Sequence, residues 1–112
     1  MIISYFTHTG RVRRNNEDAI LINDILISQK DLNDYELIDF TLNSNQTMIF
    51  AVADGMGGHS KGEVASFLVL DYLRKNYQKI DNKKSLINIL QESKNILNQY
   101  VKENPTAYGM GT

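Results

Sequence analysis

The chain has 112 residues, of which 42% are hydrophobic and 22% are charged, and it contains no cysteine. This composition suits one globular domain; it argues against a disordered chain and excludes disulfides and thiolate metal sites. Lys and Arg (12) nearly balance Asp and Glu (13), so there is no basic excess to bind nucleic acid or an anionic membrane. The start lacks a signal-peptide pattern and no apolar run could cross a bilayer, so we expect a soluble, cytoplasmic protein.

The first half of the chain predicts several short strands. Residues 2–7 are β-branched and aromatic, which is typical of a strand, and residues 19–22 read as the strand that returns after a polar, basic turn. Residues 25–46 are harder to interpret, with short strands possible on either side of a polar stretch. Residues 47–53 form a nearly continuous apolar run and are the best candidate for a central strand.

The second half predicts two helices. Ser60 and Glu63 have the spacing of a capping box, just ahead of an apolar stretch that indicates the first helix. The second helix is expected from about residue 85 to 102, with one face made of Leu86, Leu90, Ser93, Leu97 and Val101. Asn104 and Pro105 end it, and residues 106–112 look like the entry to another strand. This order predicts an α+β fold, with antiparallel strands and helices on one face.

Asp54 and Gly55 follow the apolar run directly. A carboxylate at the end of a buried strand is costly unless a positive group lies opposite, and Mg²⁺ or Mn²⁺ would suit oxygen ligands there. The glycine would leave its backbone carbonyl uncrowded, so that oxygen is a further candidate ligand. Taken by itself, the dipeptide is more often an ordinary turn or helix-capping pair.

Glu17 and Asp18 open the second strand, where neighbouring side chains point to opposite faces. Seen alone they fit a solvated turn. Together with Asp54, either one could help to bridge two metal ions roughly 3.5–4 Å apart, as in two-metal hydrolases. The sequence does not decide between the two acids.

Three arginines and a glycine-rich loop complete the candidate residues. Arg11, Arg13 and Arg14 have the planar group that suits bidentate capture of phosphate, although such a cluster is more often plain surface charge. Residues 55–62 are glycine-rich but lack both the P-loop and the dinucleotide-binding patterns. His59 in this loop could donate a proton or bind water, and is equally consistent with a surface histidine.

Taken together, these segments resemble the protein phosphatase 2C family of metal-dependent serine/threonine phosphatases, especially its bacterial members. Residues 13–19, Arg-Arg-Asn-Asn-Glu-Asp-Ala, resemble the first motif of that family. Residues 52–66, Val-Ala-Asp-Gly-Met-Gly-Gly-His-Ser-Lys-Gly-Glu-Val-Ala-Ser, resemble the second almost residue for residue. Residues 108–112, Tyr-Gly-Met-Gly-Thr, resemble the start of a later strand motif. Residues 25–46 are longer than in compact members, and we expect an extended hairpin there.

The resemblance implies an α-β-β-α sandwich, of which residues 1–112 would form an N-terminal part without the C-terminal half. It also implies hydrolysis of phosphoserine and phosphothreonine in proteins with Mg²⁺ or Mn²⁺, with phosphoproteins as substrates and a cognate Ser/Thr kinase system as a possible partner. Asp54 would bridge the metals, the Gly55 carbonyl would bind one of them, and Glu17 or Asp18 would supply the opposing carboxylate. Arg13 would hold the substrate phosphate.

The resemblance also implies that His59 matches the histidine of the bacterial glycine loop. The acids after Asp54 are expected on solvated helix faces: Glu63, Asp71, Asp81, Glu92 and Glu103. The metal shell would then be unfinished, so we expect little or no activity from these 112 residues alone. The rival hypotheses are a non-catalytic interaction module or pseudophosphatase with a partial sandwich, and a nucleotide-binding domain that uses the glycine loop.

Overall fold

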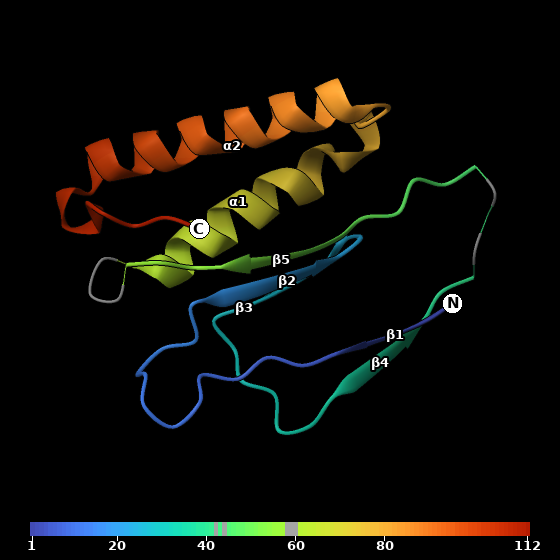
Figure 1. Cartoon of the computed structure of the whole chain (residues 1–112), viewed down its shortest axis with the longest axis horizontal. Helices are drawn as coiled ribbons and strands as arrows, with labels where there is room; N and C mark the ends of the chain where they lie inside the picture. Colours follow the sequence, from blue (N-terminus) through green and yellow to red (C-terminus); the bar gives the residue numbers. More distant parts are fainter. Residues whose placement is uncertain (42, 44, 58–60) are drawn as a thin grey trace.

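The computed structural model describes residues 1–41, 43, 45–57 and 61–112, and these residues form an α+β fold (Figure 1). Every strand pair is antiparallel, as predicted, and the described strands form two separate sheets. The strands are β1 (Ile2–Tyr5), β2 (Asp18–Ile22), β3 (Ile25–Ser28), β4 (Glu36–Asp39) and β5 (Phe50–Asp54), and the two long helices are α1 (Gly62–Asn76) and α2 (Lys83–Glu103).

The larger sheet has the strand order β3-β2-β5, and α1 packs across one of its faces. Alternation along β2 explains this contact, because Ala19 and Leu21 are fully buried and point to the same face. Ala53 of β5 joins them, together with Leu70 of α1. The strand expected over residues 47–53 is confirmed as β5, although it begins at Phe50. Its expected central position is wrong for the described strands, because the central strand of this sheet is β2 and β5 lies at the edge.

The helices form an outer layer in which α2 lies along α1 (Figure 1). The start of α2 is set by Asn82 and Ser85, which form a reciprocal capping box and begin the helix slightly earlier than expected. The face that α2 turns inward includes Ile89 and Ser93, whereas Leu90, predicted for that face, is exposed. Nowhere in the described parts of the chain is a helix long and apolar enough to cross a membrane.

The helix α1 begins at Gly62. Its N-cap residue is Lys61, in a left-handed conformation with φ 66°, and among the described residues no side chain caps the helix. Ser60 lies outside the described residues, so the capping box expected for Ser60 and Glu63 stays a prediction. A Cβ atom on Gly62 would lie 3.0 Å from the backbone carbons of Gly55 and Met56, so glycine permits the close approach of the helix start to this segment.

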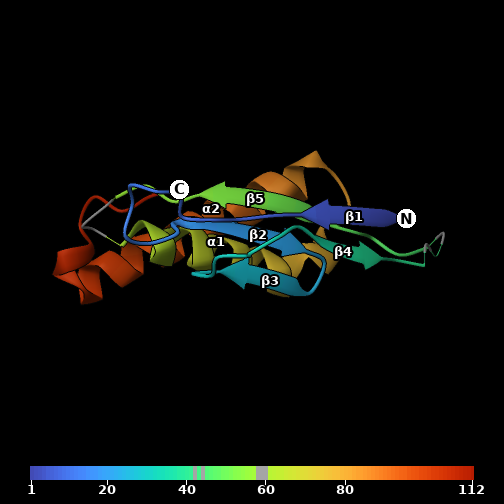
Figure 2. The same ribbon diagram turned by 90° about the horizontal axis from the view of Figure 1, so that it is seen from below.

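The smaller sheet pairs β1 with β4 and lies on the side of β2 and β5 that faces away from the helices (Figures 1 and 2). This corrects two expectations. Residues 19–22 do not return beside residues 2–7, because β2 pairs with β3 and β5. Residues 25–46 are not one hairpin, because β3 and β4 belong to different sheets. Strands that follow one another in the sequence were expected to pair, but β1 pairs with β4 and β2 pairs with β3 and β5.

Candidate metal and phosphate site

Asp18 and Asp54 lie directly opposite each other at the end of the β2–β5 pair. Side chains of directly opposed residues in an antiparallel pair share one face, with Cβ atoms about 4.5–5.5 Å apart. Two acids that are 36 positions apart in the sequence are thus brought side by side by strand register. A shared metal site requires Asp54 to lie close to one acid of the Glu17–Asp18 pair, and this register brings Asp18 beside it.

The electrostatics of Asp18 reflect that neighbour. The pKa of Asp18 is raised above its ordinary value by partial burial first, then by the negative charge of Asp54 and a hydrogen bond with its carboxyl group. The positive charge of Arg13 acts in the opposite direction. A pair of carboxylates that repel one another is a place where a cation, or a shared proton, is stabilising.

Glu17 has a different environment from Asp18. Its side chain is only 6% exposed and accepts a hydrogen bond from Arg13, with 2.6 Å between Nη1 and Oε2. Its carboxyl carbon lies against Gly62 at the start of α1. Of the two neighbouring acids left open by the sequence, Asp18 is therefore the one that faces Asp54, and Glu17 is the one that holds an arginine.

The backbone around Glu17 is fixed by two donors. The Gly55 N–H and the Ser66 hydroxyl both donate to the Glu17 carbonyl, at 3.1 and 2.6 Å. A Cβ atom on Gly55 would collide with the carbonyl oxygens of Glu17 and Gly62, so any side chain at this position is excluded. Gly55 after β5 and the first turns of α1 are therefore held against the segment that carries the two acids.

A cavity of about 790 Å³ opens beside these groups and is lined by Arg13, Glu17, Asp54 and Gly55. Arg14 and Lys61 also line it, so its walls carry both cationic and anionic side chains. A smaller cavity of about 240 Å³ is lined by Asp18 together with Arg13, Glu17 and Asp54. Positive side chains suit phosphoryl oxygens and paired carboxylates suit a divalent ion.

Strand register brings two acids of the site, Asp18 and Asp54, to directly opposed positions. Within residues 1–41, 43, 45–57 and 61–112, no three His, Asp or Glu side chains are arranged to hold a metal ion. Mg²⁺ commonly binds through one or two carboxylates and keeps several waters, so the pair and the Gly55 carbonyl fit a weak, hydrated site. His59 lies outside the described residues, and its expected role stays a prediction.

The later acids were expected on solvated helix faces, and Glu63 does not fit that description. Glu63 lines the large cavity, and its Oε2 atom is buried without a hydrogen-bond partner among the described residues. Asp71 pairs with Arg74 and Lys75 on its own helix. The pattern of the sequence could not separate Glu63 from the other helical acids, because the residues that line a cavity with it, such as Arg14 and Gln29, are distant in the sequence.

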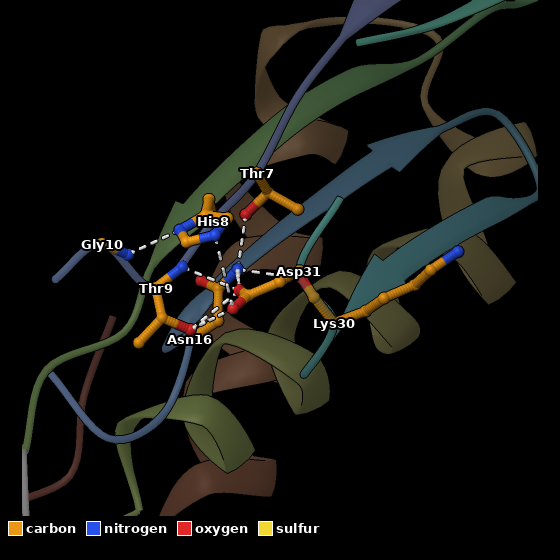
Figure 3. A network of polar contacts seen from close by, with 7 residues as sticks. All are labelled: Thr7, His8, Thr9, Gly10, Asn16, Lys30 and Asp31. Carbon is orange, nitrogen blue, oxygen red and sulfur yellow. Dashed lines mark hydrogen bonds and ion pairs between the residues drawn. The ribbon is translucent and has the colours of Figure 1, made fainter. Parts of the chain in front are cut away.

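A polar network next to the acids was not anticipated (Figure 3). It joins Asn16, just before Glu17, to Thr7 and Thr9 after β1 and to Asp31 after β3. Asn16 is 7% exposed and Thr7 is 5% exposed, so the network is largely closed to solvent at its centre. Residues 25–46 had been given no role, and only the separate pairings of β1 and β3 bring these segments together.

The C-terminal residues return to the same place. Met56 and Gly111 exchange two backbone hydrogen bonds, at 2.7 and 2.9 Å, and the Thr112 hydroxyl donates to the Asp54 carbonyl at 3.0 Å. Residues 106–112 were expected to enter a strand. They form a single bridge beside the end of β5, preceded by a short 3₁₀ turn.

Comparison of the chain with protein-family models, with curated proteins and with solved structures found no match. The resemblance to phosphatase 2C therefore rests on the motifs of the sequence alone.

Proposed function

We propose that this chain carries the metal-binding and phosphate-binding part of a phosphatase 2C-type site, which hydrolyses phosphoserine and phosphothreonine in proteins with Mg²⁺ or Mn²⁺. The observation that supports it most is the direct opposition of Asp18 and Asp54. Chance agreement of two motifs does not require their acids to share one face at one sheet end. The two sheets with helices on one side are also compatible with part of an α-β-β-α sandwich.

In the proposed site, the acidic residues bind the metal and Arg13 binds the phosphate. Asp18 and Asp54 hold the divalent ion, and the Gly55 carbonyl supplies a third oxygen. Arg13 is anchored by one nitrogen on Glu17 and keeps its other donors for phosphoryl oxygens, since guanidinium has five N–H groups. Arg13 is 66% exposed, which leaves it open to a substrate. A bound divalent ion would lower the pKa of a water nucleophile and neutralise phosphoryl charge.

We expect the 112 residues on their own to hydrolyse phosphopeptides slowly or not at all, because two clustered carboxylates are few for a pair of metal ions. Metal binding tests the proposal without depending on turnover. Calorimetry with Mn²⁺ should give a binding isotherm for the wild-type chain and none for Asp54→Asn. A matched control is Asp24→Asn, which removes an exposed carboxylate from the β2–β3 turn. Equal binding by the wild type and Asp54→Asn would refute the assignment of the ligands.

A phosphopeptide assay then separates the catalytic and non-catalytic alternatives. Mn²⁺ binding with no detectable turnover fits the expectation for this chain. Rapid Mn²⁺-dependent release of phosphate, abolished in Asp54→Asn, would show that these residues are sufficient for hydrolysis. That result would contradict the expectation of little or no activity. An absence of Mn²⁺ binding would favour an interaction module.

A further inference from the structure

Asn16 lies in the polar network of Figure 3, and it also contacts Asp18 through a hydrogen bond. Its side-chain nitrogen donates to the Thr7 hydroxyl at 2.8 Å, to the Lys30 carbonyl at 3.0 Å and to Asp31 Oδ1 at 3.2 Å. Acceptors surround that nitrogen, so the amide has one favourable orientation. Its oxygen accordingly faces the other way and accepts the Asp18 N–H at 3.1 Å.

Asp31 fixes the outer side of this arrangement. Its Oδ1 atom accepts both the backbone N–H and the hydroxyl of Thr9, each at 2.7 Å, as well as the contact from Asn16. The same contacts lower the pKa of Asp31 below its ordinary value, the Thr9 hydroxyl being the main cause. His8 Nε2 lies 3.9 Å from its other oxygen. One carboxylate thus ties the segment after β1 to the segment before β2.

We infer that Asp31 is a positioning residue for the proposed metal site and acts through Asn16 on the backbone of Asp18. Asp18 is the first residue of β2, and its N–H donates to the Asn16 side chain. This hydrogen bond therefore fixes the backbone orientation at Asp18 and, with it, the direction of the Asp18 side chain. Loss of the anchor lets the Asn16 amide turn, and Asp18 then spends less time facing Asp54. Residues that orient ligands from outside the coordination shell typically change metal affinity by about 10–100-fold.

The test rests on the proposed function and compares Mn²⁺ dissociation constants. Asp31→Ala should weaken binding by about tenfold. Asp31→Asn keeps the shape and an acceptor oxygen for Thr9, so it should retain more affinity than the alanine variant. The matched control is Asp34→Ala, which removes the same charge from the same loop, where Asp34 bonds only to the N–H of Tyr35 among the described residues. That control should leave the affinity unchanged.

Equal weakening in Asp31→Ala, Asp31→Asn and Asp34→Ala would indicate long-range charge alone and would overturn the inference. An unchanged Mn²⁺ affinity in Asp31→Ala, with binding by the wild type, would also overturn the inference. That result would leave the proposed function intact. If the wild type does not bind Mn²⁺, the proposed function fails by itself.

Hydrogen exchange of the Asp18 amide reports on the positioning step without metal. Its exchange should be faster in Asp31→Ala and unchanged in Asp34→Ala, because the amide bonds to Asn16. An equal exchange rate in the wild type and Asp31→Ala would overturn the inference whatever the metal result.

Discussion

Replacement of Asp54 by asparagine should have opposite effects on the stability of the protein with and without metal. In the metal-free protein, two carboxylates face each other across β2 and β5, and each is repelled by the other. Asparagine has nearly the same shape, removes one charge and can donate to Asp18. Asp54→Asn should therefore stabilise the metal-free fold while it removes a ligand.

The expected magnitudes differ enough to be separated. Cross-strand pairs contribute roughly 0.2–1 kcal/mol, so relief of the repulsion should give about 0.5 kcal/mol. For a domain of this size that is a rise in melting temperature of roughly 2–4 °C. With Mn²⁺ at about 100 times its dissociation constant, the wild type should gain about 2.7 kcal/mol, which Asp54→Asn should not share.

The pH dependence of the metal-free comparison follows from the raised pKa of Asp18. The folded protein holds this proton more tightly than the unfolded chain does. The destabilising repulsion is therefore complete above the folded-state pKa and fades as the pH falls toward the ordinary value of an aspartate. The advantage of Asp54→Asn should shrink over the same range.

Thermal unfolding in EDTA and in Mn²⁺ measures both effects on the same samples. The order of the two melting temperatures should reverse between the two conditions, and Asp24→Asn should not show this reversal. A metal-free Asp54→Asn protein that melts below the wild type would refute the argument from repulsion. Parallel curves in Mn²⁺ would refute the ligand assignment.

Three further predictions concern the groups around the acids. Arg13→Ala should destabilise the protein by about 1.5 kcal/mol in a denaturant titration, because Glu17 loses its charged donor while buried; no change would show that the pair is not formed. Gly55→Ala should lower the free energy of unfolding by on the order of 3 kcal/mol, because its Cβ would collide with backbone atoms. Gly111→Ala would meet only ordinary contacts and should leave the free energy of unfolding nearly unchanged. Equal effects of the two substitutions would contradict the close packing at Gly55. Mn²⁺ affinity should fall on acidification through the raised pKa of Asp18, and calorimetry across that range should detect proton release on binding; a flat profile would count against Asp18 as ligand.

Local patterns in the sequence were sufficient to place most of the secondary structure. The apolar run before Asp54 predicted β5, and the spacing of apolar residues predicted both helices. The alternation of apolar residues in a strand and their helical spacing in a helix are properties of one segment. They can therefore be recognised without knowledge of the rest of the chain. Strand pairing is not local. The alternation of residues 19–22 does not say which strands they lie beside, and in the structure β2 pairs with β3 and β5.

The candidate site divides in the same way. The motifs singled out Asp54 and the Glu17–Asp18 pair, and alternation along a strand implied that the two neighbouring acids would face different surroundings. Which acid faces Asp54 depends on the register of β2 against β5, which no spacing records. Asp31 gave no signal at all, because its partners Thr9 and Asn16 lie 22 and 15 positions away and meet it only in the folded protein.

The most direct test of the proposal is paramagnetic broadening of backbone amide signals as Mn²⁺ is added to the wild-type chain. The signals of Asp18 and Asp54 should disappear first, followed by those of Glu17 and Gly55. First broadening at the helical acids, such as Asp71, with Asp18 and Asp54 unaffected, would show that the opposed carboxylates are not a metal site.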